Sequence, residues 1–409
     1  MLYGMETKTL VRLPPLGASA VPSVRRAPTQ SCRTMQTPTA GLRNPGREMA
    51  TSKSYPGYPG EFYPGPPARR ATPPDTLLYV EVKPEQEPIV FHPQYDIRFF
   101  GLENLHSFDA KKWGKVKQNL VSRRLIREEQ IVSPEAASDE DLEVVHTREY
   151  LKSLKSSFLV AAITEVLPVA VLPNSLVQSR LIDPFRRHTG GSVLAGKLAL
   201  ERGWAINIGG GFHHCCGCAG GGFCVFADIT LCAYFARDKK KIRRIMIVDL
   251  DAHQGNGHER DLMGDKDVYI LDVYNSEVYP QDNAAKAAID KKVELKCGTS
   301  TEVYLKAVQG ALNEAAQELA SAPPELIIYN AGTDVLEGDR LGRLNVSPEG
   351  VIARDEMVFA FAKSRSIPIV MLTSGGYQKS TAGVIADSIA NLAQQGLITL
   401  GTKQVSVSE

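Results

Sequence analysis

Acidic and imidazole side chains gather in the stretch IVDLDAHQGN, where Asp249, Asp251 and His253 are spaced two residues apart. At this spacing the three side chains point to one face of an extended strand. Asp334, in the separate stretch NAGTD, can supply a further carboxylate. Two aspartates and one histidine, here Asp251, His253 and Asp334, leave an open coordination position, as a catalytic zinc site requires. Manganese or iron would accept the same ligands, and capping a helix or turn is the ordinary role of a single such aspartate.

Two adjacent histidines, His213 and His214, follow three glycines in the stretch GGGFHH. Adjacent residues of a regular strand face opposite ways, so a loop made flexible by glycine must present both imidazoles. Beside a metal ion they suit general-base and electrostatic roles, and a second metal site or a pair of buried core histidines is the alternative. Tyr377 follows two glycines in TSGGY, where its phenol could stabilise an oxyanion or be an ordinary loop side chain.

Four of the seven cysteines lie within ten residues: Cys215, Cys216, Cys218 and Cys224. A structural zinc knot is one interpretation, but the spacing is too short for the usual tetrahedral chelation and no second Cys-x-x-Cys follows. We therefore interpret these thiols as part of a loop near the active centre. An odd, clustered set of cysteines also argues against a disulfide framework and indicates a reducing compartment.

Short apolar runs precede the residues that could do chemistry. Six runs rich in Ile and Val are typical of strands buried on both faces of a parallel sheet, at 89–91, 204–208, 245–250, 268–273, 326–330 and 367–372. Helical patterns lie between them, at 192–202, 229–237, 302–321, 350–364 and 381–395. This alternation predicts a single large three-layer α/β domain with a mostly parallel central sheet. Ligands bind outside the carboxyl ends of such strands, so the polar residues should meet at one edge.

Proline divides the chain into two parts, because 15 of the 25 prolines precede residue 89. We expect residues 1–87 to be a disordered tail rich in Pro, Gly and Arg, residues 88–400 to be the catalytic domain, and residues 401–409 to be flexible. The tail could bind protein partners, and its Arg-rich, acid-poor first 50 residues are also typical of a transit peptide. Deletion of residues 1–84 should leave activity intact.

Four separated stretches, GGGFHH, IVDLDAHQGNGHE, YNAGTDVLEGDRLG and TSGGY, resemble in this order the histone deacetylase family, which has the arginase–deacetylase fold. The stretches EPIVFHPQYDIRFFGLENLHSFDAKKWGKV and RGWAINIGGGFHHC look like its class IV group. The resemblance covers about residues 88–400. It implies metal-assisted hydrolysis that removes acetyl and long-chain fatty-acyl groups from the ε-amino group of lysine in histone or non-histone proteins.

The resemblance also implies a role for each matching residue. The zinc ligands fall on Asp251, His253 and Asp334, the general base on His214, its electrostatic partner on His213, and the oxyanion-stabilising tyrosine on Tyr377. Asp249 matches the carboxylate that orients the first histidine and helps to hold a potassium ion. The walls of the acyl-lysine channel fall on Gly222, Phe223, Tyr279 and Leu341.

Asn256 stands where most deacetylases have an aspartate, although the class IV group shares the asparagine. An amide cannot stabilise an imidazolium as a carboxylate does, so the pKa of His214 should be lower than in those relatives. Strong simple deacetylation is therefore less expected than removal of longer acyl groups.

The net charge of +1 gives no basic field, so direct sequence-specific binding of nucleic acid is not expected. The sequence has no run of 18 apolar residues, and we predict no membrane span. The resemblance places the chain in the nucleus, the cytoplasm or both. Two other functions stay open: an amidohydrolase acting on acetylated polyamines, and a non-catalytic scaffold with the same fold.

Overall fold

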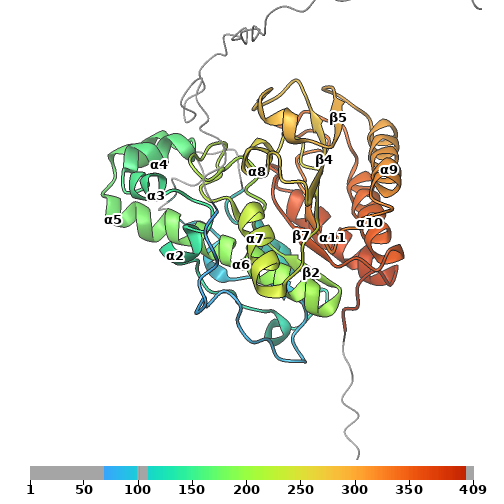
Figure 1. Ribbon diagram of the computed structural model, residues 1–409, viewed down its shortest axis with the longest axis horizontal. Coiled ribbons are helices and arrows are strands. Elements are labelled where there is room, and N and C mark those ends of the chain that lie inside the picture. Colours follow the sequence, from blue (N-terminus) through green and yellow to red (C-terminus); the bar gives the residue numbers. More distant parts are fainter. Residues whose placement is uncertain (1–68, 99–100, 102–108, 402–409) are drawn as a thin grey trace, which may run out of the picture. The chain divides into compact units, whose positions relative to one another are not determined.

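Seven parallel strands form the central sheet, in the spatial order β1-β2-β7-β6-β3-β4-β5 (Figure 1). The computed structural model describes residues 69–98, 101 and 109–401, which all belong to one compact unit. The strands are β1 (Ile89–Val90), β2 (Trp204–Asn207), β3 (Ile245–Asp249), β4 (Val268–Asn275), β5 (Lys291–Leu295), β6 (Leu326–Asn330) and β7 (Ile369–Leu372). Every residue of β2, β3, β6 and β7 is buried, because helices cover both faces of the sheet.

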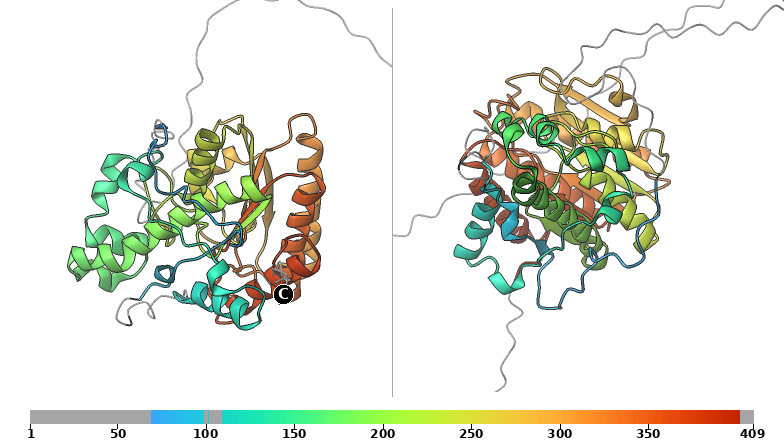
Figure 2. Two further views of the ribbon diagram at one scale, coloured as in Figure 1. Left: turned by 90° about the horizontal axis from the view of Figure 1, so that it is seen from below. Right: turned by 90° about the vertical axis from the view of Figure 1, so that its left-hand side faces the viewer.

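Helices pack on the two faces of the sheet (Figure 1 and Figure 2). On one face α6 (Asp183–Arg202) contacts β1, β2 and β7 and packs against α7 (Asp228–Lys240). On the other face α9 (Thr301–Glu318) contacts β4 and β5. The same layer contains α10 (Pro348–Ser364), α11 (Thr381–Gln394) and α1 (Lys112–Ser122). In the part of the chain that the structure describes, no helix is long and apolar enough to cross a membrane.

Most of the short helices between α1 and α6 form a lobe at one end of the domain (Figure 1). They are α2 (Asp139–Leu142), α3 (Arg148–Ser153), α4 (Ser157–Ile163), η4 (Leu167–Val171), α5 (Asn174–Val177) and η5 (Gln178–Ile182). This lobe holds the loop that follows β2: Tyr150 donates to Val225 O at 2.7 Å, and Phe223 N–H to Ile163 O at 3.0 Å. The remaining short helices are η1 (Pro93–Tyr95), η3 (Glu128–Gln130), α8 (Asn256–Asp261) and η6 (Ala285–Ala288).

Four strands end level with one another at one edge of the sheet. Asp249, the last residue of β3, lies opposite Asn330, the last residue of β6. Asn330 lies opposite Leu372 of β7, which in turn lies opposite Asn207 of β2. The loops that follow these four strands therefore leave the sheet side by side, as expected for the polar residues that they carry.

The predicted fold class is confirmed: the structure is an α/β domain built on a parallel sheet. Strand β5 is absent from the predicted strands, because its side chains alternate between polar and apolar at the edge of the sheet. Helix α6 begins well before the predicted residue 192. Gly190 and Gly191 break the apolar pattern, yet they are needed, since a Cβ atom on Gly190 would lie 1.9 Å from Glu135 O.

Residues 69–87 pack against the domain, although the predicted tail includes them. Leu78 is 1% exposed and belongs to the core. The guanidinium of Arg69 lies 4.5 Å from the ring centre of Tyr234, and Lys197 Nζ donates to Val80 O at 2.7 Å. The predicted boundary near residue 87 therefore lies too late, because proline-rich composition hid these few anchoring contacts. The rest of the predicted tail, 1–68, and residues 402–409 lie outside the described residues.

Candidate metal centre and active site

Asp251, His253 and Asp334 meet at the carboxyl edge of the sheet. Each offers one ligand atom, and these atoms all lie within 4.8 Å of one another. His253 Nδ1 lies 2.7 Å from Asp334 Oδ2 and 3.2 Å from Asp251 Oδ1. All three side chains are buried. The structure thus brings together the three residues that the sequence assigns to a metal ion.

The turn after β3 positions this group through its own backbone. Asp251 N–H donates to Asp249 Oδ1 at 3.1 Å, and Ala252 N–H donates to Asp334 Oδ1 at 2.9 Å. The loop after β7 approaches so closely that a Cβ atom on Gly375 would lie 2.3 Å from Asp251 Oδ2. Glycine is therefore required at this position if the carboxylate is to stay in place.

The charges of the group fit a cation. Burial and the neighbouring Asp251 raise the pKa of Asp334 to about 7. Burial alone would lower the pKa of His253, but the carboxylates of Asp251 and Asp334 raise it to about 10. Two buried carboxylates beside one imidazole thus attract positive charge strongly. Their oxygen and nitrogen atoms are suitable ligands for a divalent metal ion.

His213 is held by a carboxylate. Its Nδ1 lies 2.9 Å from Asp249 Oδ2, and its Nε2 lies 3.5 Å from Asp251 Oδ1. Burial lowers the pKa of His213, but these two carboxylates outweigh burial and raise it to about 9. The imidazole is therefore positively charged at neutral pH.

His214 is held by an amide. Its Nδ1 lies 2.9 Å from Asn256 Oδ1, and Asn256 Nδ2 donates to Asp282 Oδ2 at 3.2 Å. Arg260 makes two hydrogen bonds to the carboxylate of Asp282, at 2.6 and 2.8 Å, so the amide is fixed in turn. Burial and the neighbouring His213 and His253 hold the pKa of His214 well below its usual range. The imidazole is neutral, and its Nδ1 proton faces the amide oxygen.

The carboxylate of Asp249 is saturated by protein donors. Oδ2 lies 2.9 Å from His213 Nδ1 and 2.9 Å from His258 Nε2, while Oδ1 accepts from Asp251 N–H and from Asn330 Nδ2. A carboxylate has about four acceptor positions. The predicted contact of this side chain with His213 is present, and the potassium ion stays a prediction.

Tyr377 borders a narrow cavity of about 40 Å³ beside this group. Its ring centre lies 6.3 Å from that of His253, and its backbone N–H donates to Asp339 Oδ2 at 3.0 Å. The same cavity is lined by His213, His214, Phe223, Asp251 and Trp113. Burial and the carboxylates of Asp334 and Asp251 raise the pKa of the Tyr377 phenol, which therefore keeps its proton.

Two of the four predicted channel residues line the cavity, and the other two do not. Gly222 and Phe223 line the cavity. Tyr279 lies close to Gly222. A Cβ atom added to Gly222 would lie 2.5 Å from His214 Cδ2 and 2.9 Å from Tyr279 Cε1. Leu341 does not line the cavity. Its side chain is 37% exposed, and its backbone N–H donates to Asp339 Oδ1.

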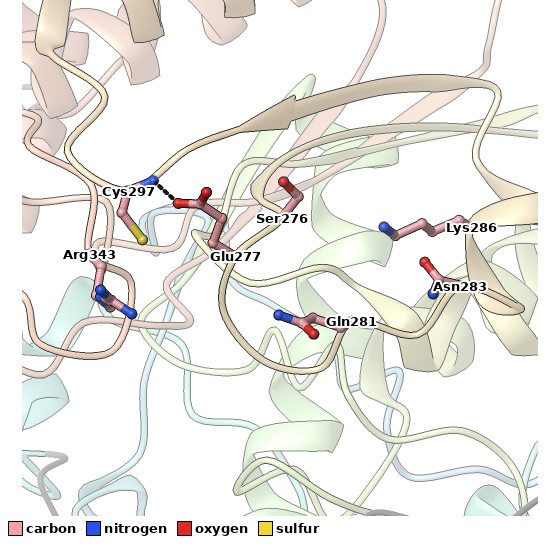
Figure 3. Close-up of a pocket in the computed structure, with 7 residues that line it drawn as sticks. All are labelled: Ser276, Glu277, Gln281, Asn283, Lys286, Cys297 and Arg343. Carbon is pink, nitrogen blue, oxygen red and sulfur yellow. Dashed lines mark hydrogen bonds between the residues drawn. The ribbon is translucent and has the colours of Figure 1, made fainter. Parts of the chain in front are cut away.

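A second hollow, of about 470 Å³, is lined by residues that are close in sequence to Tyr279 and Leu341 (Figure 3). Glu277 and Gln281, on either side of Tyr279 in sequence, contribute one wall, and Arg343 contributes the other. Glu277 accepts a hydrogen bond from Cys297 N–H at 2.9 Å. Gln281 and Arg343 both have left-handed backbones, with φ of 53° and 55°. The side chains that line the hollow are polar, whereas the narrow cavity is lined in part by Phe223 and Trp113.

Lys112 and Trp113 are site residues that sequence reasoning missed. Lys112 is fully buried, and its ammonium donates to the carbonyl oxygens of Ser374 and Gly375, the latter at 2.7 Å. Burial lowers the pKa of Lys112 to about 8. The sequence does indicate that Lys112 is buried, because it shares a helical face with Val116 and Leu120, four and eight residues later.

Asp228 and Asp339 were also missed. The carboxylate of Asp228 accepts the N–H groups of Gly211 and Phe212, each at 2.8 Å, and so shapes the glycine loop before the histidines. Gly211 has φ of +78°, a conformation that glycine adopts without strain. Asp339 accepts N–H groups from Leu341, Gly342 and Tyr377. Neither aspartate stands at a characteristic spacing from a second reactive side chain, so the sequence offered no reason to assign it to the site.

The parallel sheet and the polar group at its carboxyl edge define a protein of the α/β class with a candidate metal centre. The family profile described as "Histone deacetylase domain" matches residues 106–393. The chain belongs to the histone deacetylase family, as the resemblance in its sequence predicted.

Relatives and solved structures agree with this assignment. The chain is 57% identical over 324 residues to "Histone deacetylase 2" of Arabidopsis thaliana, covering 79% of this chain and 83% of that protein. It is 24% identical over 276 residues to "Acetoin utilization protein AcuC" of Bacillus subtilis, covering 63% and 68%. Two crystal structures share the fold. The HDA15 HD domain has a TM-score of 0.61 at 18% identity, covering 76% of this chain and 87% of that one. Acetylpolyamine aminohydrolase from Burkholderia pseudomallei has a TM-score of 0.57 at 16% identity, covering 75% and 98%.

Proposed function

We propose that this histone deacetylase family hydrolase is a zinc-dependent lysine deacylase of the class IV group, acting on protein substrates in the nucleus, the cytoplasm or both. One observation carries the proposal. Beside the group Asp251, His253 and Asp334, two adjacent histidines have different partners: a carboxylate for His213 and an amide for His214. One histidine is therefore charged and the other neutral, which is what hydrolysis of an amide by general acid and base needs.

Asp251, His253 and Asp334 would hold the zinc ion, which when bound supplies a Lewis acid and lowers the pKa of water. The Nδ1 proton of His214 points to Asn256 Oδ1, so Nε2 is the ring nitrogen that accepts a proton from water. The charged His213 stabilises the negative charge that develops on the substrate and can return a proton to the leaving lysine amine. The neutral phenol of Tyr377 donates a hydrogen bond to the oxyanion.

The cavity volume supports a short acyl group. A space of about 40 Å³ suits the end of an acetyl group, whereas a long fatty-acyl chain would need the cavity to widen. We place the polypeptide on either side of the substrate lysine in the polar hollow that Arg343 lines (Figure 3). Removal of long acyl groups is the second activity that the same experiment tests.

Purified protein is given an acetyl-lysine peptide, a myristoyl-lysine peptide and acetylspermidine, with and without a zinc chelator, and products are measured by mass spectrometry. We expect turnover of the acetyl-lysine peptide that the chelator abolishes. Turnover of acetylspermidine alone would instead support an amidohydrolase for polyamines. The absence of turnover on all three substrates would support a non-catalytic scaffold.

A further inference from the structure

Two cysteines in the loop after His214 face each other: the Sγ atoms of Cys216 and Cys218 lie 3.8 Å apart. Cys216 and Ala219 exchange backbone hydrogen bonds of 2.9 and 3.3 Å, which closes residues 216–219 into a tight turn. We call this segment the thiol turn. Cys216 is buried and Cys218 is partly exposed, so the pair can be reached from one side.

The fold fixes the backbone between the two thiols. Gly217 N–H donates to Asp261 Oδ1 at 2.8 Å. Gly217 O accepts from Thr147 N–H at 2.9 Å, and His146 Nδ1 lies 3.3 Å from the same oxygen. Three contacts on one residue thus hold the turn that places the sulfur atoms together, which makes their proximity a property of the backbone.

The other thiols of the cysteine cluster are placed differently. Cys215 Sγ donates to Val225 O at 3.1 Å, and Cys224 Sγ donates to Gly222 O at 3.4 Å; both are buried. Burial raises the pKa of both thiols. In contrast, the hydrogen bond with Cys216 lowers the pKa of Cys218 to about 7, and the charge of Arg260 assists. The candidate metal group found among the described residues contains no cysteine.

We propose that Cys216 and Cys218 form a redox-active dithiol, which hydrogen peroxide converts into an intramolecular disulfide that lowers the activity of the adjacent site. The effect on activity rests on the proposed deacylase function. The Cys218 thiolate attacks peroxide: an S–O bond forms, the O–O bond breaks, and hydroxide leaves with the electron pair. The Cys216 thiol then attacks the sulfur of Cys218. An S–S bond forms, the S–O bond breaks, and water leaves with the thiol proton.

The disulfide would strain a connection to the base histidine. The sulfur atoms must close from 3.8 Å to about 2.0 Å, which bends the thiol turn at Gly217. Gly217 is bonded to Asp261, the last residue of α8, and α8 begins at Asn256, the partner of His214. A shift of the turn therefore acts on His214 both through the chain and through α8.

Mass spectrometry of the full chain tests the chemistry without any need for activity. The protein is treated with hydrogen peroxide, its free thiols are alkylated, and the peptide that contains Cys215, Cys216 and Cys218 is analysed. We expect this peptide to lose two hydrogen atoms, and dithiothreitol to restore them. The Cys218→Ser variant should show no such loss, and Cys216→Ala should instead trap a sulfenic acid on Cys218 that dimedone labels. A loss of two hydrogen atoms in Cys218→Ser, or none in the wild type, would overturn the proposal.

Activity on the acetyl-lysine peptide tests the consequence. We expect oxidation to reduce wild-type turnover at least tenfold, dithiothreitol to restore it, and Cys218→Ser to keep its activity in peroxide. Cys32→Ser, which removes a cysteine that lies outside the cluster in the sequence, is the control and should lose activity in peroxide as the wild type does. Disulfide formation with unchanged turnover would overturn the regulatory role. If the disulfide forms but the reduced protein turns over no substrate, the deacylase proposal fails and the dithiol stands.

Discussion

The side-chain oxygen of Asn256 lies 2.9 Å from Nδ1 of His214, so an uncharged amide holds the histidine that we assign as the base. Its neighbour His213 has the carboxylate of Asp249 at the same distance. Two histidines adjacent in sequence thus have opposite electrostatic surroundings. The pKa of His214 lies below its usual value and that of His213 is raised to about 9.

Replacing Asn256 with aspartate should raise the pKa of His214, because an adjacent negative charge favours the imidazolium form. A general base works when it is neutral, that is, above its pKa. On lowering the pH, activity of Asn256→Asp should therefore be lost at a higher pH than activity of the wild type, by roughly one unit. Profiles of kcat/KM against pH check this, with the exposed Asn313→Asp as control. Identical acidic limbs in Asn256→Asp and the wild type would contradict the assignment of His214.

Tyr377→Phe should fold normally and lose most of its activity. The ring stays, so packing is preserved, but the donor to the oxyanion is removed, which typically lowers kcat by a factor of about 10²–10³. Steady-state kinetics with the best substrate measures the effect, and thermal unfolding verifies the fold. Near-wild-type kcat in a well-folded variant would exclude this role for Tyr377.

Lys112→Met should impair both activity and stability. The variant leaves the carbonyl oxygens of Ser374 and Gly375 without their buried donor, at a cost of about 1–3 kcal/mol in the free energy of unfolding. These carbonyls belong to the second and third residues before Tyr377, so kcat should also fall. Lys115→Met removes a more exposed lysine of the same helix, paired with Asp109, and should have little effect. Denaturant unfolding and kinetics of the two variants check this, and equal stabilities would count against the role of Lys112.

Deletion of residues 1–84 should destabilise the domain, contrary to the expectation from composition. It removes Leu78 from the core, and loss of one buried leucine side chain typically costs about 2–5 kcal/mol. Deletion of residues 1–68 retains every described contact and is the matched control. Thermal unfolding of the two shortened proteins measures the difference. Equal melting temperatures would show that residues 69–84 do not contribute.

The metal group could be predicted from the sequence because its geometry is local. Asp251 and His253 follow a buried strand with a period of two, and Asp334 follows another strand that ends at the same edge. Parallel strands bring their carboxyl ends together, so Asp334 could be placed in one site with the other two residues although it is about 80 residues away in the sequence. His213, His214 and Tyr377 followed from the same rule.

Other parts of the structure depend on contacts that no local pattern contains. Lys112 meets the loop after β7 across more than 260 residues of sequence, and only the fold brings the two together. Strand β5 is polar on its exposed side, so its apolar content falls below that of the buried strands. The segment before β1 is rich in proline, and its packing depends on single anchors such as Leu78.

Bound zinc and deacetylation rate, measured on the same samples, test the central claim most directly. The protein is stripped of metal with a chelator and titrated with zinc, alongside Asp334→Asn. We predict that stripped protein is inactive, that the rate rises in proportion to bound zinc and saturates at one ion per chain, and that Asp334→Asn binds zinc weakly and stays inactive. Full deacetylation by metal-free protein, or by Asp334→Asn without bound zinc, would contradict the account.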